Sequence, residues 1–331
     1  MTWLFAILLF QTAAELTDEA QRLAKSGNTA EAEKLWQRAI VQSPKFFPAL
    51  FNLGYLNYSL ERFEQACEFL EKAAQISPND FNSHYLLGAA NSRLGKIDAA
   101  LRAWRTAETL QPNSLRLLQA MIVEYGKGHY YEDAARTAKR ALSLNPALPN
   151  LYFLAIKALQ DAGDYARAFE IASQAVQRFP QEARAHFEYG FHLQKLGRVE
   201  ESLQSLHRAM ELDPLYEEPR YFYGDLLLKQ GRAQESIPHL ESAIRIRNDY
   251  LPARLELARA LMSLKRWDEA LRVLEETAKI DAQHPQPHLL LSQLYFRRGD
   301  EKRAQQEKEL SLRLRRNKPE LLELPQSRPF R

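Results

Sequence analysis

The residue types that most often carry catalysis or metal binding form no recognisable site in this sequence. The one cysteine, Cys67, excludes an internal disulfide and a cysteine-ligated metal. His284 and His288 have helical spacing, but Pro285 and Pro287 prevent one helix from presenting both rings. The sequence contains no phosphate-binding or dinucleotide-binding glycine motif, no paired-histidine zinc motif and no nucleophile elbow. We therefore expect no enzymatic activity, no metal site and no cofactor.

The composition is typical of a well-packed helical protein. Of the 331 residues, 45% are apolar and 26% are charged. The formal net charge of +3 is too small to favour nucleic acid as a partner. Sixteen prolines against 12 glycines indicate helices separated by turns more than loop-rich β structure.

An internal repeat of 34 residues organises the chain. Prolines recur at this spacing, namely Pro44, Pro78, Pro112, Pro146, Pro180 and Pro214. An alanine lies five residues before each of them, namely Ala39, Ala73, Ala107, Ala141, Ala175 and Ala209. Glycines fall at two further positions, namely Gly54, Gly88, Gly190 and Gly224, and Gly27, Gly95, Gly163, Gly197, Gly231 and Gly299. Within each repeat an apolar pattern of helical period stops at a turn and restarts, which predicts two helices per repeat.

Each recurring residue type has a physical reason. Small residues such as Gly88 and Ala100 let two antiparallel helices approach closely, which a branched side chain would prevent. Proline cannot continue a helix, so Pro112 turns the chain into the next repeat. Cys67 falls at a register that is apolar in other repeats, so we expect a small buried side chain there.

This pattern resembles the tetratricopeptide repeat in its length and in the places of its small residues, its glycine and its proline. The resemblance implies an all-α fold, an α-solenoid in which antiparallel helical hairpins form a right-handed superhelix. We expect nine repeats to account for residues 15–318, beginning at residues 13, 47, 81, 115, 149, 183, 217, 251 and 285. Residues 319–331, with three prolines, predict an irregular tail.

Some repeats depart from the family pattern. Ile122 and Ile156 replace the small residue at the eighth position, so the helices of the fourth and fifth repeats should lie further apart. Asn57 and Asn91 occupy a register that is usually apolar. In the ninth repeat Lys308 replaces a large apolar residue, as expected of a polar terminal face.

In the resembled family, partners usually bind a concave groove lined by the first helices, chiefly through the second, fifth, ninth, twelfth and thirteenth positions. The candidate partner-binding residues at these positions are Phe51, Tyr55, Tyr58, Tyr85, Phe153, Phe187, Phe191, Tyr221, Lys195 and Lys229. The aromatic and cationic residues are densest in repeats five to seven. The thirteenth position is basic in most repeats, and Asp161 is its only acid.

Two interpretations of these residues stay open. The aromatic side chains could pack between neighbouring first helices, with the basic row favoured by the helix macrodipole. They could instead form an aromatic floor with a positive edge, suited to a peptide with acidic or carboxylate groups. The family's clamp for carboxylate-terminated chaperone tails is missing: Asn52 matches its middle position, but the lysine, asparagine and arginine positions before and after it hold Thr17, Gln21, Asn82 and Leu86.

Residues 1–14 predict a secretory signal. An apolar run ends at Phe10, too short to span a bilayer at about 20 residues, and small residues follow for cleavage after Ala13 or Ala14. No lysine or arginine precedes the run, so the alternative is an uncleaved apolar segment that packs on the first hairpin.

We predict a non-enzymatic scaffold that binds a protein or peptide segment in its groove. The signal places it outside the cytoplasm, periplasmic or secreted, in a cell-envelope assembly, with membrane contact only through an uncleaved signal segment. One alternative is an oligosaccharide-binding carrier or regulator, because stacked aromatic rings with amide and acid partners also suit sugars. Another is a cytoplasmic adaptor, if residues 1–14 are not a signal.

Overall fold

The computed structural model describes residues 11–317 as α-helices joined by short turns, with no strand in that range. Two compact units account for these residues. We call residues 11–168 the N-terminal unit and residues 169–317 the C-terminal unit. Most of the expected signal, residues 1–10, and the expected tail, residues 319–331, lie outside the described residues.

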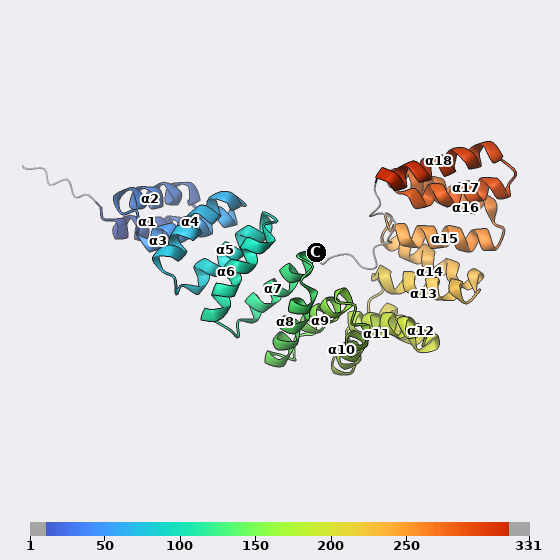
Figure 1. Ribbon diagram of the computed structural model, residues 1–331, viewed down its shortest axis with the longest axis horizontal. Helices are drawn as coiled ribbons and strands as arrows, with labels where there is room; N and C mark the ends of the chain where they lie inside the picture. Colours follow the sequence, from blue (N-terminus) through green and yellow to red (C-terminus); the bar gives the residue numbers. More distant parts are fainter. Residues whose placement is uncertain (1–10, 318–331) are drawn as a thin grey trace, which may run out of the picture. The chain divides into compact units, whose positions relative to one another are not determined.

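Successive helices pair into antiparallel hairpins (Figure 1). Odd-numbered helices are the first helices of the hairpins and even-numbered helices are the second helices. The N-terminal unit contains α1 (Ala13–Lys25), α2 (Thr29–Gln42), α3 (Phe47–Ser59), α4 (Phe63–Ile76), α5 (Phe81–Arg93), α6 (Ile97–Leu110), α7 (Leu115–Lys127), α8 (Tyr131–Leu144) and α9 (Pro149–Asp161).

The boundary between the units falls inside α10 (Tyr165–Arg178). The C-terminal unit continues with α11 (Ala183–Lys195), α12 (Val199–Leu212), α13 (Glu217–Lys229), α14 (Ala233–Ile246), α15 (Leu251–Ser263), α16 (Trp267–Ile280), α17 (Pro285–Arg297) and α18 (Glu301–Asn317). These observations confirm the predicted all-α helical repeat solenoid.

Capping side chains fix where several first helices begin. Thr12 and Glu15 form a capping box at the start of α1, in which each side chain accepts a hydrogen bond from the other residue's backbone N–H. Asp80 accepts from the backbone N–H of Ser83 at the start of α5, and Ser114 caps α7 in the same way. Unpaired N–H groups at these helix ends are thereby satisfied.

The turn inside each hairpin requires a left-handed backbone at one residue. Gly27, Gly95 and the equivalent glycines have φ between 70° and 88°. Glu61, His129 and Lys265 hold the same turn with φ between 59° and 60°, at a cost that glycine avoids. The glycine register found in the sequence therefore reflects backbone geometry.

Small residues at the eighth position bring the two helices of a hairpin into contact. A Cβ atom added at Gly88 would lie 2.3 Å from the Trp104 ring, and one at Gly224 would lie 2.8 Å from Cγ of Leu240. This confirms the expected reason for the small residues. Cys67 is also buried as expected, with 8% of its surface exposed.

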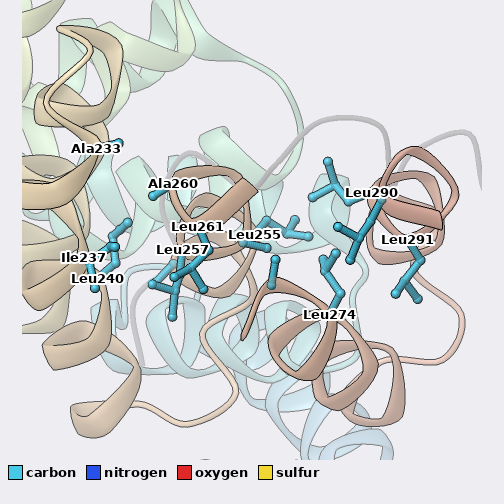
Figure 2. Close-up of a cluster of buried hydrophobic side chains, with 14 of the residues drawn as sticks. Ala233, Ile237, Leu240, Leu255, Leu257, Ala260, Leu261, Leu274, Leu290 and Leu291 are labelled. Atoms are coloured by element: carbon cyan, nitrogen blue, oxygen red, sulfur yellow. The ribbon is translucent and has the colours of Figure 1, made fainter. Parts of the chain in front are cut away.

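Apolar side chains join neighbouring hairpins. In the C-terminal unit, Ala233, Ile237 and Leu240 of α14 belong to the same buried cluster as Leu257 and Leu261 of α15 (Figure 2). Leu240 and Leu255 are completely buried. The apolar side of each hairpin is therefore removed from water only when the first helix of the next hairpin covers it.

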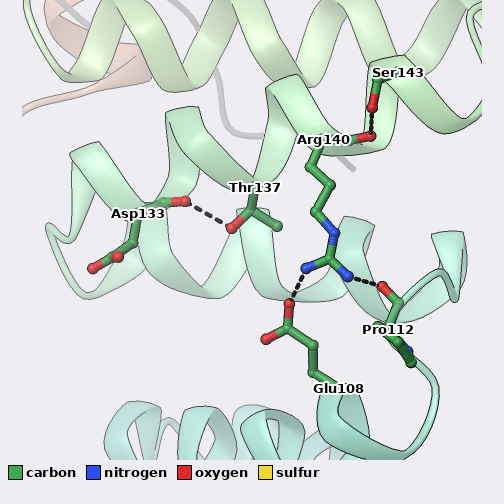
Figure 3. A network of polar contacts seen from close by, with 6 residues as sticks. All are labelled: Glu108, Pro112, Asp133, Thr137, Arg140 and Ser143. Atoms are coloured by element: carbon green, nitrogen blue, oxygen red, sulfur yellow. Dashed lines mark hydrogen bonds and ion pairs between the residues drawn. The ribbon is translucent and has the colours of Figure 1, made fainter.

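Polar contacts join the second helices of neighbouring hairpins near the proline turns. The guanidinium of Arg140 on α8 donates to Glu108 of α6 and to the backbone carbonyl of Pro112 (Figure 3). In the C-terminal unit a contact of another kind lies within one hairpin, where Arg247, directly after α14, donates to Glu217 at the start of α13 with an N–O distance of 2.7 Å. The bond to Pro112 satisfies a backbone carbonyl that the turn leaves without a helical partner, and the bonds to Glu108 and Glu217 are charge-assisted.

The polar residues that depart from the family pattern find local partners. Asn57 and Asn91 are buried, and their side-chain amides donate to the carbonyls of Leu53 and Leu87, at 2.8 Å and 2.9 Å. Lys308 of α18 is exposed.

Candidate functional site

The candidate residues lie on one side of the first helices, which we call the first-helix face. On α3 this face is an aromatic stripe in which Phe47, Phe51, Tyr55 and Tyr58 follow one another at helical spacing. The rings of Phe47 and Phe51 stack with centroids 5.9 Å apart. Tyr55 is 55% exposed, and the other three side chains are half-buried, so the stripe presents aromatic surface to solvent.

The stripe of α5 carries a cation over one of its rings. Phe81 and Tyr85 stack with centroids 5.8 Å apart, and the guanidinium carbon of Arg116 on α7 lies 4.3 Å from the Tyr85 centroid. Arg116 is exposed and has no ion pair among the described residues. As the second residue of α7, it stands at the helix end where the macrodipole disfavours a positive charge. An interaction with the helix macrodipole therefore does not account for the positive charge at position 116.

Further along the N-terminal unit, a buried acid neutralises a member of the basic row. Glu124 is 1% exposed, and its Oε2 atom accepts from Lys127 at 2.8 Å and from the hydroxyl of Ser92 at 2.6 Å. Lys157 and Asp161 on α9 form a similar pair. The positive edge expected here is thus partly balanced by acids on the same helices.

Aromatic residues of the C-terminal unit occupy the same registers but are mostly covered. Phe187 and Phe191 are 7% and 6% exposed. Phe222 contacts both rings, with centroids 5.5 Å and 5.3 Å away, and Tyr216 contacts Phe187 at 5.3 Å. Tyr221 continues the cluster through Phe222. These rings pack against each other and leave little surface for a partner.

Tyr221 is half-buried and its ring lies 5.3 Å from that of Tyr250. Burial raises the pKa of the Tyr221 hydroxyl, with the nearby carboxylates of Asp225 and Glu256 acting in the same direction. Burial also raises the pKa of Glu256, which is paired with Arg259. The carboxylate of Glu256 beside Tyr221 therefore already has a basic partner.

The two predicted lysines of this unit differ. Lys229 is paired with the buried carboxylate of Asp225 at 2.6 Å, and Asp225 also accepts from the amide of Gln194 at 3.3 Å. Lys195 is exposed, and its ammonium lies 5.3 Å from the Phe191 ring centroid. Burial, with a smaller contribution from Lys195, lowers the pKa of His192 to about 4, so this imidazole is neutral at physiological pH.

The structure therefore separates the ten predicted residues by environment. Tyr55, Lys195 and Lys229 are exposed, and Phe51, Tyr58, Tyr85 and Tyr221 are half-buried. Phe153, Phe187 and Phe191 are buried. Repeats five to seven have the densest set of such residues in the sequence, but four of the five predicted aromatic residues that stay accessible lie on α3 and α5.

Sequence reasoning missed three residues of the first-helix face. Phe47 and Phe81 stand at the first position of their repeats, one helical turn before Phe51 and Tyr85. That spacing of four residues was a readable signal. Arg116 gave a weaker signal, because it is only a cation at the second position of its repeat. Its contact with Tyr85 crosses from one repeat to the next.

The histidines have structural contacts. Nε2 of His84 lies 2.9 Å from the Pro78 carbonyl, and Nε2 of His186 lies 3.0 Å from that of Pro180. Among residues 11–317, no three His, Cys, Asp or Glu side chains are placed to share a metal ion. In the same range no helix is both long enough and apolar enough to cross a bilayer.

Comparisons with known proteins agree on one repeat family. Family models described as tetratricopeptide repeat match residues 17–81, 159–226 and 227–294, more than half of the chain. No curated protein matches the sequence.

Similar solved structures include Cut9–Hcn1, an APC/C hetero-tetramer, at 14% identity and a TM-score of 0.57, over 95% of this chain and 64% of that chain. A tetratricopeptide repeat protein from Parabacteroides merdae matches at 14% identity and a TM-score of 0.51, over 76% of this chain and 100% of that one. YrrB, a repeat protein described as having an unusual peptide-binding site, matches at 20% identity and a TM-score of 0.45, over 57% and 97% of the two chains. At these identities the likeness concerns the fold.

Proposed function

The chain belongs to the tetratricopeptide repeat family, whose repeats indicate a protein–protein interaction scaffold, and we propose that it binds an extended peptide on the first-helix face of its N-terminal unit. The family's proteins are generally non-enzymatic scaffolds. The observation that carries the proposal is the partly exposed aromatic stripe of α3 and α5.

Aromatic rings held this way suit a peptide. Phe47 and Phe51 are stacked, as are Phe81 and Tyr85, so their positions are fixed before a partner arrives. Rigid aromatic side chains contribute large contact areas at a low cost in conformational entropy. Exposed aromatic surface of this kind is more typical of an interaction site than of a bare solvated face.

Charge favours a carboxylate in the partner. Arg116 has its guanidinium on Tyr85 and no carboxylate partner among the described residues. Arg93, on α5, has its guanidinium carbon 4.7 Å from the Phe63 ring centroid, and its Nη2 atom forms an exposed ion pair with Oε1 of Glu61 at 3.5 Å. An acidic side chain of the peptide, placed near Tyr85, would pair with Arg116 in a partly desolvated setting.

Peptide selection from a random displayed library, followed by titration of the selected peptides, tests this function. We expect selected peptides to contain acidic residues beside aromatic or aliphatic ones. The double variant Tyr55→Ala with Tyr85→Ala should weaken their binding at least tenfold, since aromatic anchors carry about 2 kcal/mol or more each. Lys195→Ala in the C-terminal unit is the matched control and should leave binding unchanged.

Two other results would redirect the assignment. Binding to oligosaccharides on a glycan array, abolished by the same double variant, would support a sugar-binding carrier in place of a peptide scaffold. Peptides that bind wild type and double variant equally would place the binding surface elsewhere on the chain.

Export to a periplasmic or extracellular assembly forms the second part of the proposal and rests on residues 1–14. The expected cleavage after Ala13 or Ala14 would remove Thr12, and with it the N-cap of α1. N-terminal sequencing of the protein from its native source should find Ala14 or Glu15 first. An intact Met1 would favour the cytoplasmic adaptor.

A further inference from the structure

A group of hydrogen-bond donors lies on α12, α13 and α14, away from the aromatic residues of the first-helix face. Arg220 and Tyr223 stand three residues apart on α13, so they share one side of that helix. The Tyr223 ring centroid lies 4.4 Å from that of His239 on α14 and 6.5 Å from that of His207 on α12. Nε of Arg220 donates to the hydroxyl of Ser242 on α14 at 3.0 Å. We call these five residues the basic cluster.

Most donors of the basic cluster have no acceptor. Nη1 of Arg220 is buried and makes no hydrogen bond. Among the described residues, neither the Tyr223 hydroxyl nor the His239 ring forms a hydrogen bond, although their rings are in contact. Ser242 accepts from Arg220, which leaves its own hydroxyl hydrogen available. Because a buried guanidinium nitrogen without a partner is unfavourable, the cluster lacks an acceptor.

An arginine at the same register of the next repeat shows what such an acceptor can be. Arg254 of α15 stands 34 residues after Arg220. Its guanidinium donates to the backbone carbonyl of Asn248 at 2.7 Å and to the side-chain oxygen of the same residue at 2.5 Å. Its Nη1 atom lies 3.5 Å from a carboxylate oxygen of Glu276 on α16. An amide in the preceding turn and a carboxylate on the second helix thus complete this arginine site.

The seventh repeat lacks both of these side-chain acceptors. Pro214 stands at the register of Asn248, and Ser242 stands at that of Glu276. Proline has no side-chain acceptor, and a serine hydroxyl carries no negative charge. Arg220 therefore occupies an arginine site from which the negatively charged acceptor is missing.

Nearby acids do not fill this place. Two of them are ion-paired with an arginine on or next to their own helix, namely Glu211 with Arg208 at 2.9 Å and Glu235 with Arg232 at 2.6 Å. Glu211 also lies 3.4 Å from Nδ1 of His207. The third acid, Asp213, is exposed and lies outside ion-pairing distance of Arg220. Burial lowers the pKa of Arg220, and the weaker effect of Asp213 does not reverse this.

We propose that the basic cluster binds the phosphoryl group of free phosphate or of a small phosphate ester. A phosphoryl group carries three strong acceptor oxygens and accepts paired hydrogen bonds from a guanidinium. It can therefore accept from Arg220 and from the hydroxyls of Ser242 and Tyr223, whereas a carboxylate has only two oxygens. The residues that would donate are half-buried between helices, which favours a small ligand. This inference does not depend on the peptide site of the N-terminal unit.

The two histidines add a dependence on pH. Burial, followed by the charges of Arg220 and His207, lowers the pKa of His239, and Glu235 acts weakly in the opposite direction. A bound anion favours the protonated ring and should raise this pKa again. Anion binding should therefore strengthen as pH falls through the range in which the histidines titrate. Sulfate is the probe for this measurement, because it keeps both of its charges over that range while phosphate does not.

Calorimetric titration of the full chain with inorganic phosphate, glycerol 2-phosphate and acetate tests the proposal. We expect both phosphates to bind more tightly than acetate, and the tighter of the two identifies the source of the phosphoryl group. Arg220→Gln should weaken phosphate binding about tenfold or more, because it removes charge-assisted hydrogen bonds. Arg245→Gln is the matched control, because it removes the same charge from an exposed position on α14 and should leave binding unchanged.

A second variant supplies the missing acceptor. Ser242→Glu reproduces the carboxylate that Glu276 provides to Arg254, so it should abolish phosphate binding while the protein keeps or gains stability in a thermal melt. It therefore tests the site even if Arg220→Gln fails to fold. The pKa of His239, followed by NMR through the ring signal that His239→Gln removes, should rise when sulfate is added.

Several results would overturn the proposal. They are equal weakening by Arg220→Gln and Arg245→Gln, undiminished phosphate binding by Ser242→Glu, and absence of phosphate binding to wild type. Acetate that binds as tightly as phosphate would overturn the phosphoryl assignment. An unchanged pKa of His239 in sulfate would exclude His239 from the site.

Discussion

The two units place aromatic residues at the same registers of their first helices but use them differently. Phe51 and Tyr85 of the N-terminal unit are half-buried, whereas Phe187 and Phe191 of the C-terminal unit are covered. The difference arises at the residue before each first helix. There the N-terminal unit has Asp80 and Ser114, whose short side chains cap α5 and α7.

In the C-terminal unit, tyrosines stand at that position before α13 and α15. Tyr216 and Tyr250 make no side-chain cap. Tyr216 packs on the buried ring of Phe187, and Tyr250 packs on the half-buried ring of Tyr221. Phe222 closes the cluster from within α13. Asp80 and Ser114 thus leave Phe51 and Tyr85 half-buried, whereas Tyr216 helps to bury Phe187. The exposure of an aromatic ring thus depends on a residue of the next repeat, which the positions within a single helix do not reveal.

Truncation of equivalent aromatics should separate the units most clearly. Phe187→Ala should lower the free energy of unfolding by about 3–5 kcal/mol, because it empties a buried space. Tyr55→Ala, on an exposed side chain, should change stability by at most about 0.5 kcal/mol. Denaturant unfolding of both variants measures the contrast. A small effect of Phe187→Ala would show that its cluster does not support the C-terminal unit.

Acid should act on the C-terminal unit through His192. Its folded-state pKa of about 4 lies below the ordinary value of 6.5, so the unfolded state binds the proton more readily. The contribution of neutral His192 to the free energy of unfolding is fully present above pH 6.5. It is lost as pH falls towards 4, and the total loss is about 3 kcal/mol.

The raised pKa values of Glu218 and Glu256 act in the opposite direction, since their protonated forms are favoured by folding. The difference between wild type and His192→Leu in unfolding free energy, measured from pH 7 to pH 4, isolates the histidine. Parallel pH profiles for the two proteins would contradict the prediction.

Close packing inside the hairpins should also differ between the units. Gly88→Ala in the N-terminal unit would bring its Cβ to 2.3 Å from Trp104 and should cost about 1–3 kcal/mol. Gly190→Ala in the C-terminal unit would approach Cγ of Leu206 only to 3.1 Å, and the better helix propensity of alanine, about 1 kcal/mol, should offset this contact. Thermal melts of both variants show which one loses more stability. An equal loss of stability would show that the Leu206 side chain cannot adjust to the added methyl group.

The smallest expected contrast concerns the turn residues. Glu61→Gly should stabilise the N-terminal unit by about 1 kcal/mol, because residue 61 has φ of 59° and glycine accepts this conformation without strain. Glu61→Ala at the same position should bring no such gain. Chemical denaturation resolves the difference, and equal midpoints for the two variants would mean that the turn stores no strain.

The sequence predicted the repeat fold because its signals are local. The proline, alanine and glycine registers each report one backbone requirement, such as the left-handed turn at Gly95 or the contact of Gly88 with Trp104. The candidate site was harder because exposure depends on contacts between repeats. Neither the cover of Tyr216 over Phe187 nor the hydrogen bond of Ser92 to Glu124 has a signature within a single helix.

Among the helix contacts that the structure describes, each helix packs only on helices one or two places away, and this also affects how the chain is made. Proteins dominated by contacts between nearby residues fold quickly, because closing a short loop costs little entropy. During synthesis, each hairpin can bury its apolar side as soon as the next first helix leaves the ribosome. The nascent chain then exposes one unfinished end face at a time, which limits the surface available for aggregation while translation continues.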